Sequence, residues 1–170
     1  MIILIKFLIL ALLLFITSWL GIILSKKYSN RVKELKQVKT GLNIIENKIK
    51  FTYEPIPEIF KEISTKFIGS VSGIFKNSYE NMKNIDAGKA WESSIDIANC
   101  NLNKEDKDVI KGLGKLLGKT DVDGQISQLN LINNFLDTQI KQAEAEKEKG
   151  EKLYRKLGVI SGLIIVIALI

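Results

Sequence analysis

The feature that most constrains this chain is an apolar run of 23 residues, Ile2–Leu24, interrupted only by Lys6 and a few small polar residues. Coiled as a helix with a rise of ~1.5 Å per residue, the run is about 35 Å long, enough to cross a hydrocarbon core of ~30 Å with some tilt. A cleaved signal peptide is the alternative, but such peptides have apolar cores of only ~7–15 residues followed by an A-x-A-like site, which this sequence lacks. We therefore predict a retained transmembrane helix over residues 1–25.

A second apolar block, Leu157–Ile170, closes the sequence. Its 14 residues reach only ~21 Å as a helix, which is short for a full span. Adding Leu153 and Tyr154, and letting Arg155 and Lys156 snorkel, extends the block to roughly 27 Å. A buried core helix and a membrane-dipping tail are alternatives, but the block has no face polar enough for water. We predict a membrane segment over residues 157–170 and leave open whether it crosses the bilayer completely.

Basic residues flank both apolar blocks on the sides that face the middle of the chain. They are Lys26, Lys27, Arg31, Lys33, Lys36 and Lys39 after the first block, and Lys147, Lys149, Lys152, Arg155 and Lys156 before the second. Because cytoplasmic flanks of membrane helices are enriched in Lys and Arg, we expect residues 26–156 to lie in the cytoplasm. Both termini would then lie at or across the far side of the membrane.

The distribution of charge argues against nucleic-acid binding. Residues 25–50 hold eight Lys and Arg and two Glu, so their net charge of +6 equals that of the whole chain. Residues 51–170 hold 16 basic and 17 acidic side chains. A basic stretch next to a membrane helix is explained by topology and by anionic lipid headgroups, so we expect the lipid bilayer and no nucleic acid as a partner.

Apolar residues between the two blocks recur every three or four positions, which indicates amphipathic helices. One apolar stripe, Val32–Ile49, continues the first membrane helix and ends before Glu54–Pro57, which contains the only two prolines. Strand-like alternation is not convincing anywhere, so we predict an all-α, membrane-anchored bundle of about six helices. The further predicted stripes are Ile59–Phe67, Val71–Met82, Ala87–Ile95 after an Asp86 cap, and Val109–Leu117 after a capping box of Asn103 and Asp106.

The last predicted helix carries the stripe Ile126–Ala143 and then alternating charges, with Glu148 and Lys152 four residues apart as on a solvated helix. If it continues into the terminal apolar block, it is one helix of about 50 residues at ~1.5 Å each, antiparallel to the first. The domain of residues 26–156 would then have two long stalk helices. Gly150 is the expected hinge of the second stalk.

The stretch GLGKLLGKTDVDGQ, residues 112–125, resembles a phosphate-binding loop at first sight. The G-x-x-x-x-G-K-[ST] pattern needs four residues between its glycines and a strand before them. Here Gly114 and Gly118 are separated by three residues, Leu113 stands where the first glycine would be, and a helix precedes. We interpret the stretch as a corner where Gly118 ends one helix and Asp121 begins the next, and we expect no bound nucleotide.

Residues for enzyme chemistry are scarce in this sequence. It has no His, the commonest general base and metal ligand, and its single Cys100 cannot form an internal disulfide or a thiolate zinc cluster. A membrane-bound hydrolase that uses Glu58, Glu62 or Asp86 is the alternative, because two carboxylates one helical turn apart can act as acid and base. On an exposed helix such carboxylates are usually only solvated, so we predict no enzyme, no catalytic residue, no metal and no cofactor.

Several short motifs occur in a characteristic order along the chain. They are Trp19-Leu20-Gly21, YEPIPEIF at Tyr53–Phe60, Ala90-Trp91, Leu117-Gly118-Lys119-Thr120-Asp121 with Gln125, and Lys156-Leu157-Gly158 to Gly162-Leu163. With these motifs in this order, the chain resembles the stage III sporulation protein AB family of endospore-forming bacteria over essentially its full length. That family is similar to the inner-membrane platform domain of type II secretion and type IV pilus systems. Thr120 departs from the Ser that is more often found at its position.

The resemblance implies a membrane platform in a secretion-like apparatus between mother cell and forespore. It implies a secretion-type ATPase and ring-forming membrane proteins as partners, and the mother-cell membrane facing the forespore as location. A static scaffold or oligomerising adaptor without ATPase contact is the alternative. The candidate motif or partner-contact residues are Trp91, Leu117, Gly118, Asp121 and Gln125, although a large aromatic residue on a short helix, such as Trp91, is more often a core residue.

Overall fold

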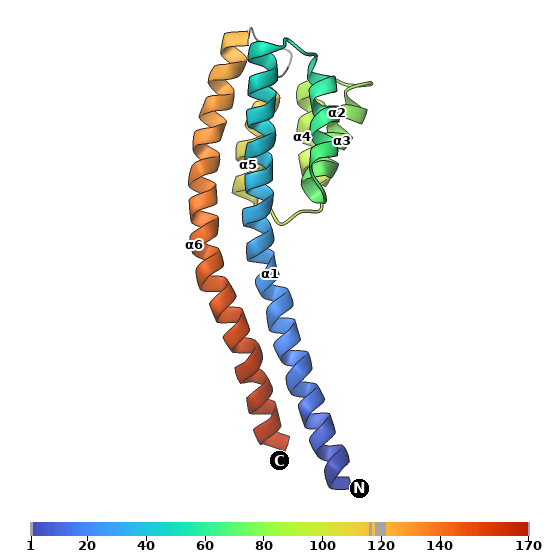
Figure 1. The fold of residues 1–170 in the computed structure, drawn as a ribbon, viewed down its shortest axis with the longest axis vertical. Coiled ribbons are helices and arrows are strands. Elements are labelled where there is room, and N and C mark those ends of the chain that lie inside the picture. Colours follow the sequence, from blue (N-terminus) through green and yellow to red (C-terminus); the bar gives the residue numbers. More distant parts are fainter. Residues whose placement is uncertain (1, 116, 118–121, 170) are drawn as a thin grey trace. The chain divides into compact units, whose positions relative to one another are not determined.

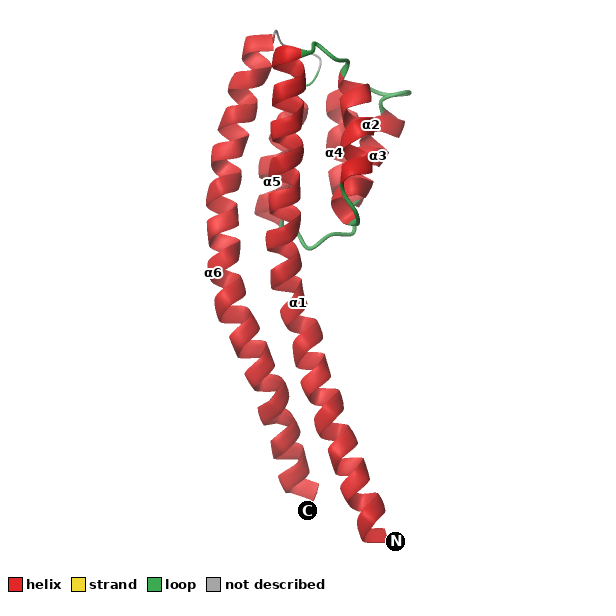
Figure 2. Cartoon of the chain, viewed as in Figure 1, coloured by secondary structure: helices red, strands yellow, loops and turns green. Residues whose placement is uncertain are grey.

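The computed structural model of the chain describes residues 2–115, 117 and 122–169 (Figure 1). Within these ranges the chain is helical and contains no strand, as Figure 2 shows. The prediction of an all-α fold with six α-helices is therefore confirmed. The helices are α1 (Ile2–Phe51), α2 (Ile56–Lys66), α3 (Ser70–Asn81), α4 (Ala87–Ile97), α5 (Lys104–Lys111), a 3₁₀ turn (Gly112–Lys115) and α6 (Val122–Leu169).

The chain divides into two compact units. The terminal unit contains residues 1–30 and 143–170, and the central unit contains residues 31–142. Helices α1 and α6 each contribute one segment to each unit, which confirms that both stalks are continuous with the apolar ends of the chain. The boundaries 25/26 and 156/157, drawn from hydropathy, concern the edges of the membrane and stay a prediction.

In the central unit, the second half of α1 and the first half of α6 run side by side (Figure 1). Their facing side chains are the predicted apolar stripes, which are buried except for Ile126, a partly exposed residue at the start of the α6 stripe. Polar contacts join the same two segments: Asn133 Nδ2 donates to Asn43 Oδ1 at 2.9 Å, and Lys39 pairs with Asp137. The buried stripes are Val32, Leu35, Val38, Leu42, Ile45 and Ile49 on α1, with Leu129, Ile132, Leu136 and Ile140 on α6.

The corners follow the residues that favour them. Pro55 caps α2 and Pro57 lies in its first turn, where the missing N–H of proline costs no hydrogen bond. Gly69 is the N-cap of α3 and has a φ of +92°, a backbone conformation that residues other than glycine rarely adopt. Asp86 accepts hydrogen bonds from the amides of Gly88 and Lys89, so the predicted cap of α4 is confirmed.

Three aromatic rings form the centre of the central unit. Phe60 lies 5.3 Å from Phe75 and 5.4 Å from Trp91, both in edge-to-face contact, and Phe75 lies 5.3 Å from Trp91. The indole nitrogen of Trp91 donates to the carbonyl oxygen of Ile110 at 2.8 Å. Gly41 allows this cluster to pack directly against α1, because a Cβ at that position would lie 2.7 Å from the Phe75 ring. The cluster thus joins α2, α3 and α4 to α1.

The predicted helix over Val109–Leu117 is wrong beyond Lys111, where the chain tightens into the 3₁₀ turn. Gly112 and Gly114 are poor helix formers. The close approach of α4 to this turn requires glycine, since a Cβ at Gly88 would lie 1.9 Å from the carbonyl oxygen of Gly114. The glycines that resemble a phosphate-binding loop therefore include one that is needed for packing. Gly118, Lys119, Thr120 and Asp121 lie outside the described residues.

Candidate functional site

The terminal unit is a pair of antiparallel helical segments that meet along small residues. On α1 these residues include Thr17, Gly21 and Ser25, each four positions after the last. On α6 the spacing is again four, with Gly158 and Gly162 in a small-x-x-x-small arrangement. Residues four apart lie on one face of a helix, and such faces allow the close helix–helix contact typical of membrane proteins.

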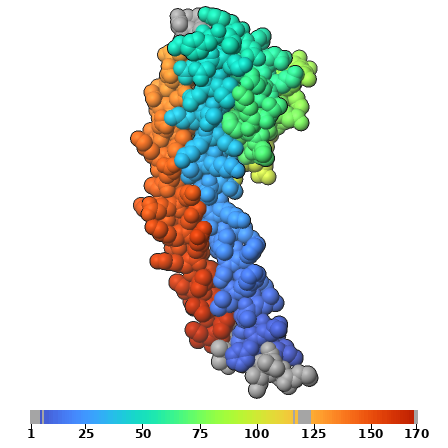
Figure 3. Space-filling view, viewed as in Figure 1, coloured from blue at the N-terminus to red at the C-terminus, as the bar shows by residue number. Residues whose placement is uncertain are grey.

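The two backbones approach so closely that side chains are excluded from the contact. A Cβ at Gly21 would lie 2.6 Å from the carbonyl oxygen of Tyr154 and 3.1 Å from Gly158 Cα. A Cβ at Gly158 would lie 2.9 Å from the carbonyl oxygen of Thr17. In Figure 3 the blue and red segments lie against each other along this contact. Glycine at both positions is therefore a requirement of this packing.

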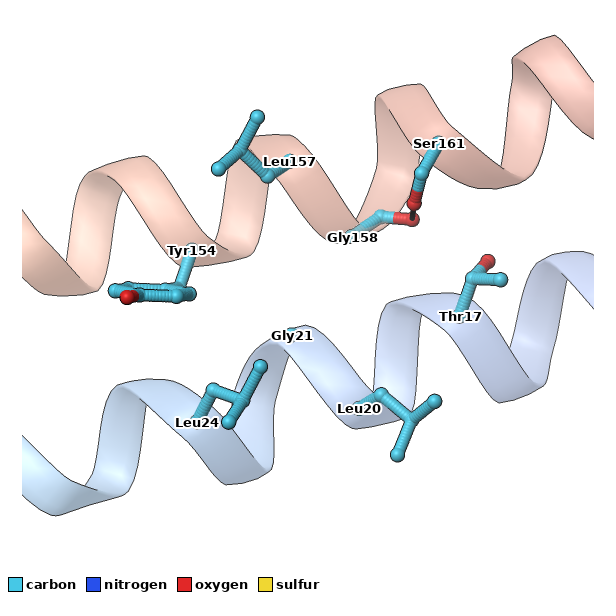
Figure 4. Close-up of a pocket in the computed structure, with 8 residues that line it drawn as sticks. All are labelled: Thr17, Leu20, Gly21, Leu24, Tyr154, Leu157, Gly158 and Ser161. Carbon is cyan, nitrogen blue, oxygen red and sulfur yellow. Dashed lines mark hydrogen bonds between the residues drawn. The ribbon is translucent and has the colours of Figure 1, made fainter.

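Beside the glycine contact, the terminal unit has a groove of about 300 Å³. Its eight lining residues appear in Figure 4, with Leu20 and Leu24 on α1 and Leu157 on α6. The two aliphatic hydroxyl groups in the lining bond to their own helices: Thr17 Oγ1 donates to the Leu14 carbonyl at 3.1 Å, and Ser161 Oγ donates to the Gly158 carbonyl at 3.1 Å. Since these groups are satisfied locally, the groove offers a mainly apolar surface.

The outer face of the N-terminal segment is apolar and exposed. Phe15 and Trp19 stack with ring centroids 5.9 Å apart, and their side chains are 61% and 55% exposed. Among the described residues, one helix, over Phe7–Phe51, is long and apolar enough to cross a membrane, and only 11% of its most apolar 18-residue window is buried. Exposure of this kind is unlike a soluble core helix and weakly supports membrane association. Insertion of residues 157–170 stays a prediction.

The predicted hinge, Gly150, lies within continuous α6. It is buried, and a Cβ there would lie 2.8 Å from the ring of Tyr28. Tyr28 in turn contacts Tyr154, with ring centroids 5.8 Å apart. Gly150 thus has a packing role against Tyr28 that no local sequence pattern indicates, and its role as a hinge stays a prediction.

The central unit contains a buried ion pair between Arg31 of α1 and Asp106 of α5. Arg31 Nε donates to Asp106 Oδ2 at 2.7 Å and Arg31 Nη2 donates to Oδ1 at 3.0 Å, so the pairing is bidentate. Asp106 is fully buried, and its side chain also accepts from the Asn103 amide, completing the predicted capping box. Gln139 of α6 accepts a further bond from Arg31 at 3.4 Å. This cluster therefore holds α1, α5 and α6 together.

Glu34, one helical turn after Arg31, forms a second buried connection. Its carboxylate accepts from the amide of Asn101 at 2.7 Å, from Asn101 Nδ2 at 2.9 Å, and from the hydroxyl of Ser70 at 2.8 Å. The partners belong to the loop before α5 and to the start of α3. The local sequence pattern indicates the capping role of Asp106, but it does not indicate the pairing with Arg31 or the contacts of Glu34, whose partners are distant in the sequence.

The carboxylates proposed for a hydrolase are placed in structural roles. Asp86 caps α4, and Glu58 lies 3.7 Å from Lys61. Glu62 pairs with Lys48 at 2.8 Å and with Lys66 at 2.7 Å, and these hydrogen bonds lower its pKa to about 2. A general base works best with a pKa near the working pH, so Glu62 is poorly suited to that role. Among the described residues, no group of three or more His, Cys, Asp or Glu is arranged to hold a metal ion.

The single thiol is half-buried, and burial raises the pKa of Cys100, which the hydrogen bond to the Leu102 backbone partly offsets. A thiol with a raised pKa is a weak nucleophile. Of the candidate contact residues, Trp91 and Leu117 are buried in the central unit, and Gln125 is partly exposed near the start of α6. Gly118 and Asp121 lie outside the described residues. A direct partner contact through Trp91 would therefore need the core to open.

Comparison with known proteins gives one consistent result. A family model described as stage III sporulation protein AB matches residues 6–170. The stage III sporulation protein AB of Bacillus subtilis (strain 168) is 27% identical over 157 residues, which are 90% of this chain and 92% of that protein. A solved structure of stage III sporulation protein AB (SpoIIIAB) is similar with a TM-score of 0.64 at 23% identity, covering 71% of this chain and 98% of that one. The similarity to the solved structure concerns the fold.

Proposed function

The chain belongs to the stage III sporulation protein AB family, and on this premise we propose that it is a membrane platform of a sporulation apparatus between mother cell and forespore. In this proposal the terminal unit inserts both ends of the chain into the mother-cell membrane. The central unit lies in the cytoplasm, where a secretion-type ATPase contacts it. The two stalks transmit the work of the ATPase to ring-forming proteins in the membrane.

The observation that carries the proposal is the glycine contact between the two apolar ends. Lipid provides no hydrophobic drive for helices to associate, so membrane helices rely on small residues that let their backbones meet. The contact of Gly21 with Gly158 has this character. It supports a hairpin whose two helices enter the same bilayer. The buried pair of Arg31 and Asp106 makes the central unit suited to passing on a displacement as one body.

ATPase contact is tested by purifying the full chain in mild detergent and measuring its binding to the secretion-type ATPase of the same apparatus. The platform proposal predicts a complex that survives size-exclusion chromatography. A chain that self-associates but does not bind the ATPase would instead be the static scaffold or oligomerising adaptor.

Transmission through the second stalk is tested by Gly150→Pro. Proline removes one backbone hydrogen bond and clashes with the preceding turn, so it should kink α6 at the start of the terminal unit. We expect spore formation to be lost in a spore former that depends on the variant, while the central unit stays folded. Glu151→Ala, a change at the next, partly exposed position, is the matched control and should sporulate normally. Normal spore counts with Gly150→Pro would contradict transmission through this stalk.

A further inference from the structure

We propose that the groove of the terminal unit binds one anionic phospholipid, with an acyl chain along the groove and the phosphate held by lysines at its Tyr154 end. The inference rests on the proposed membrane insertion of this unit. It goes further by assigning a ligand to a site that packing alone does not explain. Two observations carry it: the shape of the groove and the placement of positive charge around its end.

The positive charge forms a belt at one level of the helix pair. Gly21 contacts Gly158 and Gly150 contacts Tyr28, so residues 25–28 of α1 lie level with about residues 150–154 of α6. Side chains from both helices therefore meet at this level, although they are far apart in sequence. The basic belt consists of the exposed side chains of Lys26, Lys27, Lys149, Lys152, Arg155 and Lys156.

The belt has an excess of positive charge. Two carboxylates share its level, Glu148 and Glu151, and Glu148 is paired with Lys152 at 2.9 Å. The other five belt residues form no ion pair within the described part of the chain. Each Lys or Arg near an anionic membrane surface favours binding, and the effect is largest close to the headgroups. The belt is thus placed to attract the phosphate of a lipid.

Two belt lysines lie on the same flank as the groove. On α1, Lys27 follows Leu24 by three positions, which places it on the side that forms the groove wall. On α6, the lining residues Ser161 and Leu157 belong to a row of residues four apart that continues through Leu153 to Lys149. The row turns by ~40° at each step, so Lys149 lies at the outer edge of this flank. By the same periodicity of ~100° per residue, Lys26 and Arg155 lie on the opposite flank.

The groove itself suits an acyl chain. Its walls include the side chains of Leu20, Leu24 and Leu157 (Figure 4). The hydroxyl groups of Thr17 and Ser161 are bonded to their own helices. The aromatic ring and hydroxyl of Tyr154 lie at the end that faces the belt. Tyrosine favours this position at a membrane–water interface because one end of its ring is apolar and the other is polar. An apolar groove leading to a tyrosine and two lysines matches the order of parts in a phospholipid.

The test uses the full chain, purified in mild detergent and incubated with an equimolar mixture of phosphatidylglycerol and phosphatidylcholine of matched acyl chains. Native mass spectrometry then counts the lipid retained on each protein molecule. We expect one phosphatidylglycerol to be retained in preference to phosphatidylcholine. Equal retention of both lipids would overturn the proposal.

Two double variants separate a site from general attraction. Lys27→Gln with Lys149→Gln should weaken phosphatidylglycerol binding roughly 30-fold, about fivefold for each lysine. Lys26→Gln with Arg155→Gln removes the same charge at the same level on the other flank and should change binding less than about twofold. Equal losses in the two double variants would show diffuse attraction and would refute a site at the groove.

A third variant tests the groove without touching the charges. Ser161 is an exposed lining residue, and Ser161→Leu adds volume to the groove without entering the glycine contact. We expect it to reduce retention of phosphatidylglycerol although all belt lysines remain. Unchanged retention would refute the acyl-chain part of the proposal. Extraction of the protein from membranes by alkaline carbonate tests insertion separately: a chain released by carbonate contradicts the proposed function itself, whereas an inserted chain without lipid preference contradicts only this inference.

Discussion

The buried pair of Arg31 and Asp106 gives the sharpest prediction about stability. Asp106→Asn keeps the size of the side chain and can still accept the bond from the Asn103 amide. It removes the negative charge that neutralises a guanidinium which is only 6% exposed. Breaking a buried ion pair by changing one partner typically costs about 3–5 kcal/mol, because the remaining charge stays buried. We therefore expect the free energy of unfolding of the central unit to fall by about 4 kcal/mol.

Urea unfolding of the full chain in mild detergent measures this loss. The chain has two tryptophans, Trp19 and Trp91. In a Trp19→Phe background, the fluorescence of the fully buried Trp91 therefore reports the central unit alone. With a slope of about 2 kcal/mol per M urea, the midpoint should fall by roughly 2 M.

Two further variants establish the cause. Glu105→Gln changes an exposed carboxylate in the same helical turn and should shift stability by less than about 0.5 kcal/mol. Arg31→Met combined with Asp106→Asn leaves no buried charge and should recover most of the loss, since an ion pair can often be replaced by neutral groups. The reasoning is refuted if Asp106→Asn behaves like Glu105→Gln, or if the double variant is less stable than Asp106→Asn alone.

Three other outcomes follow from the same structure. Gly73→Ala in α3 should raise the stability of the central unit by about 0.5–1 kcal/mol in the same urea assay, because a Cβ there meets nothing within 4 Å and alanine favours helix; a lower midpoint would contradict this. Gly158→Leu should separate the helices of the terminal unit, because even the Cβ of the new side chain would lie 2.9 Å from the Thr17 carbonyl oxygen. Cysteine cross-linking between α1 and α6 measures this separation and should be lost in the variant. Unchanged cross-linking would contradict the prediction. Hydrogen bonds, chiefly from Lys48, lower the pKa of Glu62 from 4.5 to about 2. The ionised carboxylate therefore stabilises the fold at pH values above 4.5, and this contribution is lost as the pH falls toward 2. Lys48→Gln should raise this pKa toward its usual value in an NMR titration, and an unchanged titration would contradict the pairing.

Much of the fold could be predicted because local signals and packing agree. The stripe Val32–Ile49 gave the buried face of α1, and the two prolines gave the corner after it. The caps at Asp86 and Asn103 were predictable because each satisfies helix amides through a short-range hydrogen bond. These features depend on residues within a few positions of each other, which a single sequence shows directly.

Contacts between distant residues could not be predicted in the same way. Arg31 and Asp106 are 75 positions apart, and nothing near either residue identifies the other. The tight turn at Gly112–Lys115 depends on the approach of Gly88, which lies in another helix. The packing role of Gly150 likewise requires Tyr28 of α1. The four-residue spacing of Gly158 and Gly162 is a local signal for a close helix contact, but it does not identify Gly21 as the partner of Gly158.

The account depends most directly on which side of the membrane carries the central unit. The native thiol can be moved to an exposed site at the start of α5 with Cys100→Ser and Lys104→Cys. Intact protoplasts are then treated with a membrane-impermeant maleimide, and lysed protoplasts serve as the labelling control. The platform account predicts that this thiol is protected until lysis, as expected of a cytoplasmic domain that an ATPase can reach. Labelling in intact protoplasts would place the central unit outside the cytoplasm and would contradict contact with the ATPase.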